Sequence, residues 1–159
     1  MPVFLLVSLG VLLLDQFSKW WILEHFREHE VVVVWPVFNL TLAFNKGAAF
    51  SFLADAGGWQ HYLFVGLAAA VSLVLVIWLW RLPRGRVLEA WGLALILGGA
   101  IGNLIDRLLR GHVVDFLQWH WGPHYFPSFN LADSAITLGV VLLLLDGLRG
   151  SRQGEDNVR

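Results

Sequence analysis

The third of four long apolar stretches in this 159-residue chain ends with Gly98-Gly99-Ala100-Ile101-Gly102-Asn103-Leu104-Ile105-Asp106-Arg107. Gly98 and Gly102 form a small-xxx-small pattern, which lets a neighbouring helix approach closely. By itself this pattern indicates only a packed helix. Asn103 and Arg107 are four residues apart, so they share one face of that helix. The stretch therefore predicts a tightly packed membrane helix that carries polar side chains at its end.

The whole chain is too apolar for an ordinary soluble domain. It is 57% hydrophobic and only 14% charged, whereas soluble domains have roughly 25% charged residues. It has no cysteine, which excludes disulfides, thiol chemistry and thiolate metal sites. The net charge of -1 and the lack of a basic tract argue against nucleic acid as a partner. Composition therefore predicts an integral membrane protein, and nine tryptophans suit membrane interfaces.

Four stretches reach the length of about 20 apolar residues that a helix needs to cross a bilayer. They cover approximately 3–23, 59–80, 87–105 and 131–148. The first lacks a basic n-region and a cleavage site and carries Asp15 and Lys19, so we expect a retained helix rather than a signal peptide. We expect one domain over 1–150, an all-α integral membrane protein with four transmembrane helices. A disordered cytoplasmic tail is expected over 151–159.

Basic residues indicate how the helices are oriented. Six arginines fall on one side, namely Arg81, Arg84, Arg86, Arg149, Arg152 and Arg159, and four basic residues fall on the other, namely Arg27, Lys46, Arg107 and Arg110. The positive-inside rule then places both termini in the cytoplasm. The two longer connections, about 24–58 and 106–130, are expected to face outward.

The outward connections contain more than simple linkers. Val31-Val32-Val33-Val34-Trp35 and Val37-Phe38-Asn39-Leu40-Thr41-Leu42-Ala43-Phe44 are rich in β-branched residues and separated by Pro36. They predict short strands in a small extracytoplasmic β-sheet, followed by a turn at Asn45-Lys46-Gly47. The second connection is rich in aromatic residues: Phe116, Trp119, Trp121, Tyr125, Phe126 and Phe129. It predicts an interfacial loop in the headgroup layer.

Asp115 and Asp133 lie beside or within membrane-spanning stretches. Ionisable groups at membrane depth cost several kcal/mol unless they are paired or solvated. Each has an ordinary explanation, because Asp115 can be an interfacial carboxylate and Asp133 a helix-start carboxylate stabilised by the helix dipole. Two converging acids are also what proton-transfer chemistry needs.

Other polar residues near the predicted spans allow two interpretations each. Asp15 and Lys19 are four residues apart and predict either a structural ion pair or a brace behind a nearby site. Arg107 can snorkel outward, or it can hold a carboxylate by bidentate hydrogen bonds, which the nearby Asp115 favours. Asn130 is a plausible N-cap, and its spacing of three from Asp133 also suits a shared site.

Two further kinds of site are disfavoured. His112, Asp115, His120 and His124 could bind zinc, but their spacing is not a recognised ligand signature. A serine hydrolase is weaker still, because no serine has a Gly-x-Ser-x-Gly context. Asp146 and Arg149 are expected to form a surface pair at the end of the last helix.

Five sequence blocks together resemble the lipoprotein signal peptidases, also called signal peptidase II. In order, they are Asp15-x-x-x-Lys19, Asn45-x-Gly47-x-Ala49-Phe50, Gly98-Gly99-Ala100-x-Gly102-Asn103-x-x-Asp106-Arg107, Gly111-x-Val113-Val114-Asp115-Phe116 and Phe126-Pro127-x-Phe129-Asn130-x-Ala132-Asp133. Five blocks in the right order on a chain with four predicted spans make a specific signal. We find no core motif position that departs from the pattern.

The resemblance implies an aspartic endopeptidase of the bacterial cytoplasmic (inner) membrane, with its active site near the outer face. Such enzymes remove the signal peptide from prolipoproteins, cutting before a diacylglyceryl-modified cysteine, and use no metal or organic cofactor. The positions that match the family's catalytic dyad are Asp115 and Asp133. Those that match its site-lining positions are Asn45, Gly47, Asn103, Arg107 and Asn130, and Asp15 and Lys19 match a supporting polar pair. We expect the protein to be a monomer whose partners are diacylglyceryl-prolipoproteins, as substrates, and membrane lipid.

The residues alone leave two other classes of membrane protein open. A transporter or channel could use intramembrane acids to relay protons or bind cations, although four short spans without broken repeats argue against it. A membrane chaperone or assembly factor could carry the acids for structural reasons only.

Overall fold

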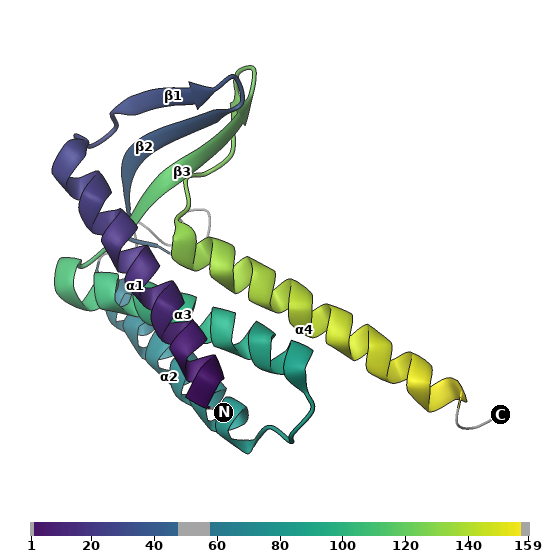
Figure 1. The fold of residues 1–159 in the computed structure, drawn as a ribbon. Coiled ribbons are helices and arrows are strands. Elements are labelled where there is room, and N and C mark those ends of the chain that lie inside the picture. The colour runs from purple at the N-terminus through teal and green to yellow at the C-terminus, as the bar shows by residue number, and fades with distance from the viewer. Residues whose placement is uncertain (1, 48–57, 157–159) are drawn as a thin grey trace.

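The computed structural model describes residues 2–47 and 58–156, which form four long helices and a small sheet at one end of them (Figure 1). The elements in chain order are α1 (Pro2–His25), β1 (Val31–Trp35), β2 (Phe38–Asn45), α2 (Trp59–Arg81), α3 (Val87–Arg110), β3 (Val113–Trp121), β4 (His124–Tyr125) and α4 (Leu131–Asp156). All four helices are long and apolar enough to cross a membrane. The predicted membrane fold with four spans is therefore confirmed.

The core of the bundle is built around α3, because α3 packs against each of the other three helices. In the most apolar window of α3, 56% of the residues are buried inside the protein, against 17% or less for the other helices. One apolar cluster joins α2 to α3 through Leu75, Leu79, Leu82, Ala90, Leu93 and Leu97. The large apolar side chains exposed on α1, α2 and α4 are left for contact with lipid.

Glycines let α1 and α4 approach α3 closely. A Cβ added at Gly98 would lie 2.6 Å from the carbonyl oxygen of Ser8 on α1, and one at Gly99 would lie 2.4 Å from that of Ala132 on α4. Gly92 on α3 and Gly139 on α4 face each other in the same way, since a Cβ on Gly139 would lie 2.6 Å from the Gly92 oxygen. The predicted close packing at Gly98 extends over a longer stripe of α3.

This packing gives a testable prediction for Gly99. Gly99→Ala should lower the free energy of unfolding by about 1–3 kcal/mol, because the new methyl group would overpack against the Ala132 carbonyl. Gly66→Ala in α2 is the matched control, since a Cβ there meets nothing within 4 Å. The control should be neutral or slightly stabilising because Ala favours helix. Thermal unfolding in detergent measures both, and equal melting temperatures would contradict the close contact.

The sheet is antiparallel, with strand order β1-β2-β3-β4. β1 and β2 confirm the predicted strands, and the break at Pro36 separates them. The pairing of β2 with β3 is irregular between Leu40 and Ala43. A cluster of Ile22, Leu42, Val114 and Phe116 fixes the sheet to the end of α1.

The connection after α3 differs from the predicted interfacial loop, because β3 is a nine-residue strand that pairs along β2. Apolar Leu117, Trp119 and Trp121 alternate with polar Gln118 and His120, which is the period of a strand. The many aromatic residues of this segment favour an interfacial loop when the sequence is considered alone. The alternation of apolar and polar residues is the signal that predicts a strand.

Two helices are longer than predicted. α3 continues to Arg110 and ends at Gly111, whose φ of 77° suits a glycine and whose N–H donates to the Arg107 carbonyl. Asp106 and Arg107 are therefore helical residues. α4 continues to Asp156, although a disordered tail was expected from Ser151. No proline interrupts that segment, and a single glycine costs a helix only about 1 kcal/mol.

Candidate active site

Asp115 on β3 and Asp133 in the first turn of α4 both line one cavity of about 680 Å³. Three other predicted site residues, Asn45, Asn103 and Arg107, line the same cavity. Asp115 is only 3% exposed, whereas Asp133 is half-buried. The structure thus brings the two carboxylates, which lie 18 residues apart in the sequence, to one place.

The start of α4 fixes Asp133 through two reciprocal hydrogen bonds with Asn130. The N–H of Asp133 donates to Asn130 Oδ1 at 2.9 Å, and the N–H of Asn130 donates to Asp133 Oδ2 at 3.2 Å. This is the arrangement of a capping box, with Asp in the place of the usual Glu or Gln. The predicted N-cap role of Asn130 therefore coexists with a role in the site.

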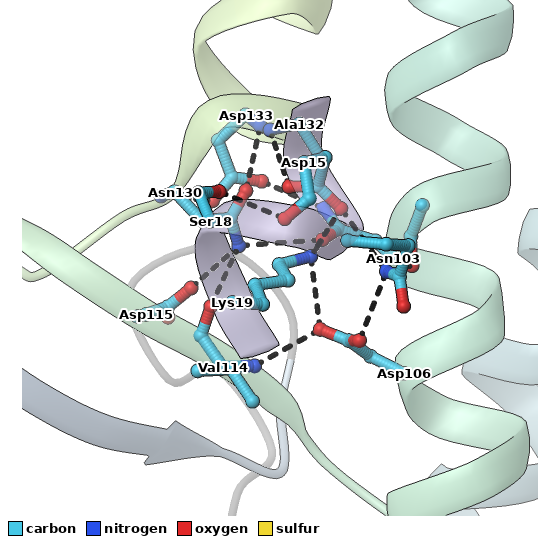
Figure 2. A network of polar contacts seen from close by, with 12 residues as sticks. Asp15, Ser18, Lys19, Asn103, Asp106, Val114, Asp115, Asn130, Ala132 and Asp133 are labelled. Atoms are coloured by element: carbon cyan, nitrogen blue, oxygen red, sulfur yellow. Dashed lines mark hydrogen bonds and ion pairs between the residues drawn. The ribbon is translucent and has the colours of Figure 1, made fainter. Parts of the chain in front are cut away.

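The side-chain amide of Asn130 also reaches the other carboxylate. Its Nδ2 donates to Asp115 Oδ1 at 2.8 Å, and it lies 3.3 Å from the Val114 carbonyl oxygen. Asn130 is completely buried. One amide group therefore contacts both Asp115 and the backbone of Asp133, and it fixes their relative positions (Figure 2).

Two further asparagines each bind one of the carboxylates. Asn103 Nδ2 donates to Asp133 Oδ1 at 2.8 Å, and Asn45 Nδ2 donates to Asp115 Oδ2 at 3.1 Å. Asn45 is itself held in a turn, because its Oδ1 accepts the N–H of Gly47 at 2.9 Å. The predicted turn at this position is confirmed, whereas the motif residues Ala49 and Phe50 lie outside the described residues.

Arg107 contacts the same turn from α3. Its Nη2 donates to the Gly47 carbonyl at 3.0 Å, and its Nη1 lies 3.4 Å from the Asn103 carbonyl. The guanidinium carbon also lies 5.6 Å from the centre of the Phe64 ring. The hydrogen bonds of Arg107 to the described residues thus go to backbone carbonyls, where the sequence favoured a bidentate contact with a carboxylate.

Behind the two candidate carboxylates lies a fully buried ionic cluster. Lys19 Nζ lies 2.8 Å from Asp15 Oδ2, 2.9 Å from Asp106 Oδ2 and 2.9 Å from Asn103 Oδ1. The side chains of Lys19, Asp15 and Asp106 are all 0% exposed. Three acceptors match the three N–H donors of the ammonium group, so its hydrogen-bonding capacity is fully used.

Each acid of this cluster holds the backbone just before one candidate carboxylate. Asp15 Oδ1 accepts the N–H of Ala132, which precedes Asp133, at 2.9 Å. Asp106 Oδ2 accepts the N–H of Val114, which precedes Asp115, at 3.1 Å. Lys19 joins the two acids, so the cluster braces both carboxylates (Figure 2). The contacts agree with both predicted roles for Asp15 and Lys19, the structural ion pair and the brace behind a nearby site.

Asp106 is the site-supporting residue that the sequence reasoning missed. It was part of a motif block, but it was given no role. Besides Lys19 and Val114, it binds Arg110 at 2.7 Å and Gln16 at 3.2 Å. Its spacing of three from Asn103 puts both on one helical face, and this was the available signal.

Burial and charge change the acidity of Asp115. Burial raises the pKa of this carboxyl from its usual 3.8 to about 7, and the nearby charge of Asp133 acts in the same direction. The amides of Asn45 and Asn130 oppose the shift by hydrogen bonding to the carboxylate. Asp115 therefore carries a proton over much of the pH range in which an ordinary carboxyl group is ionised.

The residues weighed for zinc do not gather in the described part of the chain, where no three His, Cys, Asp or Glu side chains are placed to hold a metal ion. His112 packs on Phe44 and His120 on Tyr125. At the other end of the bundle, Asp146 pairs with Arg86 at 2.7 Å, on the α2–α3 connection.

Comparison with known proteins agrees with this geometry. The profile of the family described as signal peptidase (SPase) II matches residues 7–149. A lipoprotein signal peptidase of Pseudomonas fluorescens is 53% identical over 157 residues, covering 95% of this chain and 90% of the relative. One of Acinetobacter baylyi is 52% identical over 140 residues, covering 88% of this chain and 78% of the relative.

A solved structure of similar fold supports the same relationship. It is described as a bacterial membrane enzyme, determined by the in meso method at 2.3 Å resolution. It superposes with a TM-score of 0.86 and 29% sequence identity, covering 95% of this chain and 90% of the other. The chain therefore belongs to the signal peptidase II family.

Proposed function

We propose that this chain is a membrane-embedded aspartic endopeptidase that removes the signal peptide from diacylglyceryl-modified bacterial prolipoproteins, cutting just before the lipidated cysteine. The observation that carries the proposal is the pair Asp115 and Asp133, held at one cavity by a shared asparagine. Relatives named lipoprotein signal peptidase support the substrate class.

The proposed reaction divides its two proton transfers between the carboxylates. Asp133 accepts two hydrogen bonds at the start of α4, where the helix dipole stabilises negative charge. We assign it as the base that takes a proton from the attacking water. Asp115, protonated near neutral pH, donates its proton to the scissile carbonyl oxygen. When the tetrahedral intermediate collapses, the amine leaves with a proton from the pair.

The surrounding polar groups receive supporting roles in this proposal. Asn103 and Asn130 orient the two carboxylates. Arg107 holds the turn at Gly47, and that turn keeps Asn45 on Asp115. Asp15, Lys19 and Asp106 fix the backbone beneath both acids. None of these steps calls on a metal ion or an organic cofactor.

We also propose the cytoplasmic (inner) membrane as the location, with both termini in the cytoplasm. The excess of arginine around the α2–α3 connection and toward the C-terminal end of α4 supports this orientation. The sheet and the two carboxylates then lie at the outer face, where a secreted precursor meets the membrane. We also propose that the protein acts as a monomer.

The direct test is cleavage of a diacylglyceryl-modified precursor by the purified chain, followed by gel shift. The wild-type chain should convert this precursor and leave the unmodified precursor uncut. EDTA should leave the rate unchanged, because the proposed chemistry rests on the carboxylates. No cleavage of the lipidated precursor would refute the proposed function.

The pH dependence follows from the raised pKa of Asp115. Cleavage should slow as the pH rises through about 7, because Asp115 then loses the proton that it donates. The folded protein also binds this proton more tightly than the unfolded chain, where the pKa is near 3.8. The associated stabilisation is complete below 3.8 and is lost as the pH rises through about 7.

Rates and thermal unfolding measured across this pH range check both statements. Asp115→Asn is the control for stability, since its unfolding should lose the part of the pH dependence that Asp115 causes. A cleavage rate that stays level through neutral pH would contradict the assignment of Asp115 as the proton donor.

A further inference from the structure

The active-site cavity does not end at the carboxylates but continues along one face of α4. Its lining includes Ser134, Thr137, Leu138 and Val141, which follow Asp133 at helical spacing on the same side. Leu138 is 52% exposed and Val141 is 45% exposed. We call these four residues the α4 stripe. It forms a wall that begins at Asp133 and opens toward the membrane.

The α4 stripe is chemically a hydrocarbon surface in spite of its two hydroxyl groups. The Ser134 hydroxyl donates to the Asn130 carbonyl at 3.0 Å, and the Thr137 hydroxyl donates to the Asp133 carbonyl at 2.8 Å. Both donors are thus used within α4, and the face of the helix presents mainly carbon atoms. Phe126 and Phe129 line the same cavity near its polar end.

The substrate has two apolar parts, the acyl chains and the signal peptide, and the length of the α4 stripe discriminates between them. The helix rises about 12 Å over the eight steps from Asp133 to Val141, at 1.5 Å per residue. Half of a hydrocarbon core is about 15 Å thick. An acyl chain anchored at the membrane surface spans one such half, whereas a membrane-spanning signal peptide needs about 20 residues and both halves.

We propose that the α4 stripe binds an acyl chain of the diacylglyceryl group and makes cleavage depend on acyl-chain length, with Leu138 and Val141 as specificity-determining residues. The proposal rests on the proposed function, because it needs a lipidated cysteine next to the scissile bond. The acyl chain is attached to that cysteine, so it must start beside Asp115 and Asp133. The α4 stripe is an apolar wall of the cavity that begins there and continues along the helix.

The test compares a dipalmitoyl with a dibutyryl precursor of the same sequence. Val141→Trp fills the far end of the α4 stripe and should lower kcat/KM for the dipalmitoyl precursor by about tenfold or more. The four-carbon acyl chains of the dibutyryl precursor end before Val141, so its kcat/KM should stay within about twofold. Val140→Trp is the matched control, because Val140 is 42% exposed but does not line the cavity. It should leave both precursors unaffected.

Three results would overturn the proposal. Equal losses for both precursors in Val141→Trp would assign the α4 stripe to the signal peptide. No loss for either precursor would leave it without a role in binding. Equal effects of Val140→Trp and Val141→Trp would indicate a general effect of tryptophan in the membrane. If Val141→Trp does not accumulate, Leu138→Trp, nearer the carboxylates, must show a loss that is larger for the dipalmitoyl precursor.

The outcomes separate this proposal from the proposed function. If the wild-type chain cleaves neither lipidated precursor, the proposed function fails. If it cleaves both and Val141→Trp shows no dependence on acyl length, only the assignment of the α4 stripe fails.

Discussion

Asp115→Asn and Asp133→Asn should each lower the rate of precursor cleavage by at least about a thousandfold. An asparagine keeps the size of the side chain, but it can neither accept the proton of the attacking water nor donate a carboxylic proton. Because the two acids act as a unit in the proposed reaction, the double variant should be hardly slower than either single variant. Gel shift of the lipidated precursor measures all three.

Asp146→Asn provides the matched control on α4. Asp146 lies at the other end of the helix and pairs with Arg86, so this variant should cleave at the wild-type rate. Full activity of either dyad variant would refute the assignment. Loss of folded protein together with activity would instead indicate that the acids are structural. A channel is tested separately by proton flux in liposomes, which should be the same for the wild type and Asp133→Asn.

Lys19→Met should lower the free energy of unfolding by about 3–5 kcal/mol. The substitution removes the cation that lies within 2.9 Å of both Asp15 and Asp106. It leaves the buried charge of Asp15 uncompensated and Asp106 with its second ion pair, to Arg110 at 2.7 Å. Cleavage should fall as well, since the backbone before each proposed catalytic carboxylate is held by these acids. Chemical or thermal unfolding in detergent measures the first effect and the gel shift measures the second.

Arg86→Met is the control for removal of a cation from an exposed ion pair. The Arg86 side chain is 51% exposed, and surface pairs of this kind contribute at most about 1 kcal/mol. Adding Asp15→Asn to Lys19→Met should recover part of the stability, because it removes the buried charge that Lys19 compensated, whereas Asp106 keeps its ion pair with Arg110. If Lys19→Met were no less stable than Arg86→Met, the buried cluster would not be a source of stability.

The helices were predictable because membrane spans are long and apolar, and that signal survives without knowledge of packing. The residues at which the helices end were less predictable. The predicted third span ends near Ile105, yet α3 continues to Arg110 and Asp106 is helical and completely buried. Lys19 from α1, together with Arg110, makes that burial tolerable. Local sequence patterns do not predict a partner such as Lys19, which lies 87 positions away.

The candidate site was predictable to a similar extent. The resemblance named nine residues, and the structure brings Asp115, Asp133, Asn45, Asn103 and Asn130 into direct contact with one another. The resemblance did not predict that Asp106 binds the backbone of Val114. That hydrogen bond depends on the reversal of the chain at Gly111, which a left-handed residue permits. The roles of these residues in catalysis stay predictions until the variants are measured.

The clamp that Lys19 forms with Asp15 and Asp106 has a consequence for how the enzyme meets bilayers of different thickness. Transmembrane helices adapt to a thicker or thinner bilayer mainly by tilting. Here the backbones before Asp115 and Asp133 are tied to one ammonium group rather than to the far ends of the helices. A tilt of the bundle then moves both carboxylates as one rigid unit. The distance between them therefore does not change with the lipid composition of the membrane.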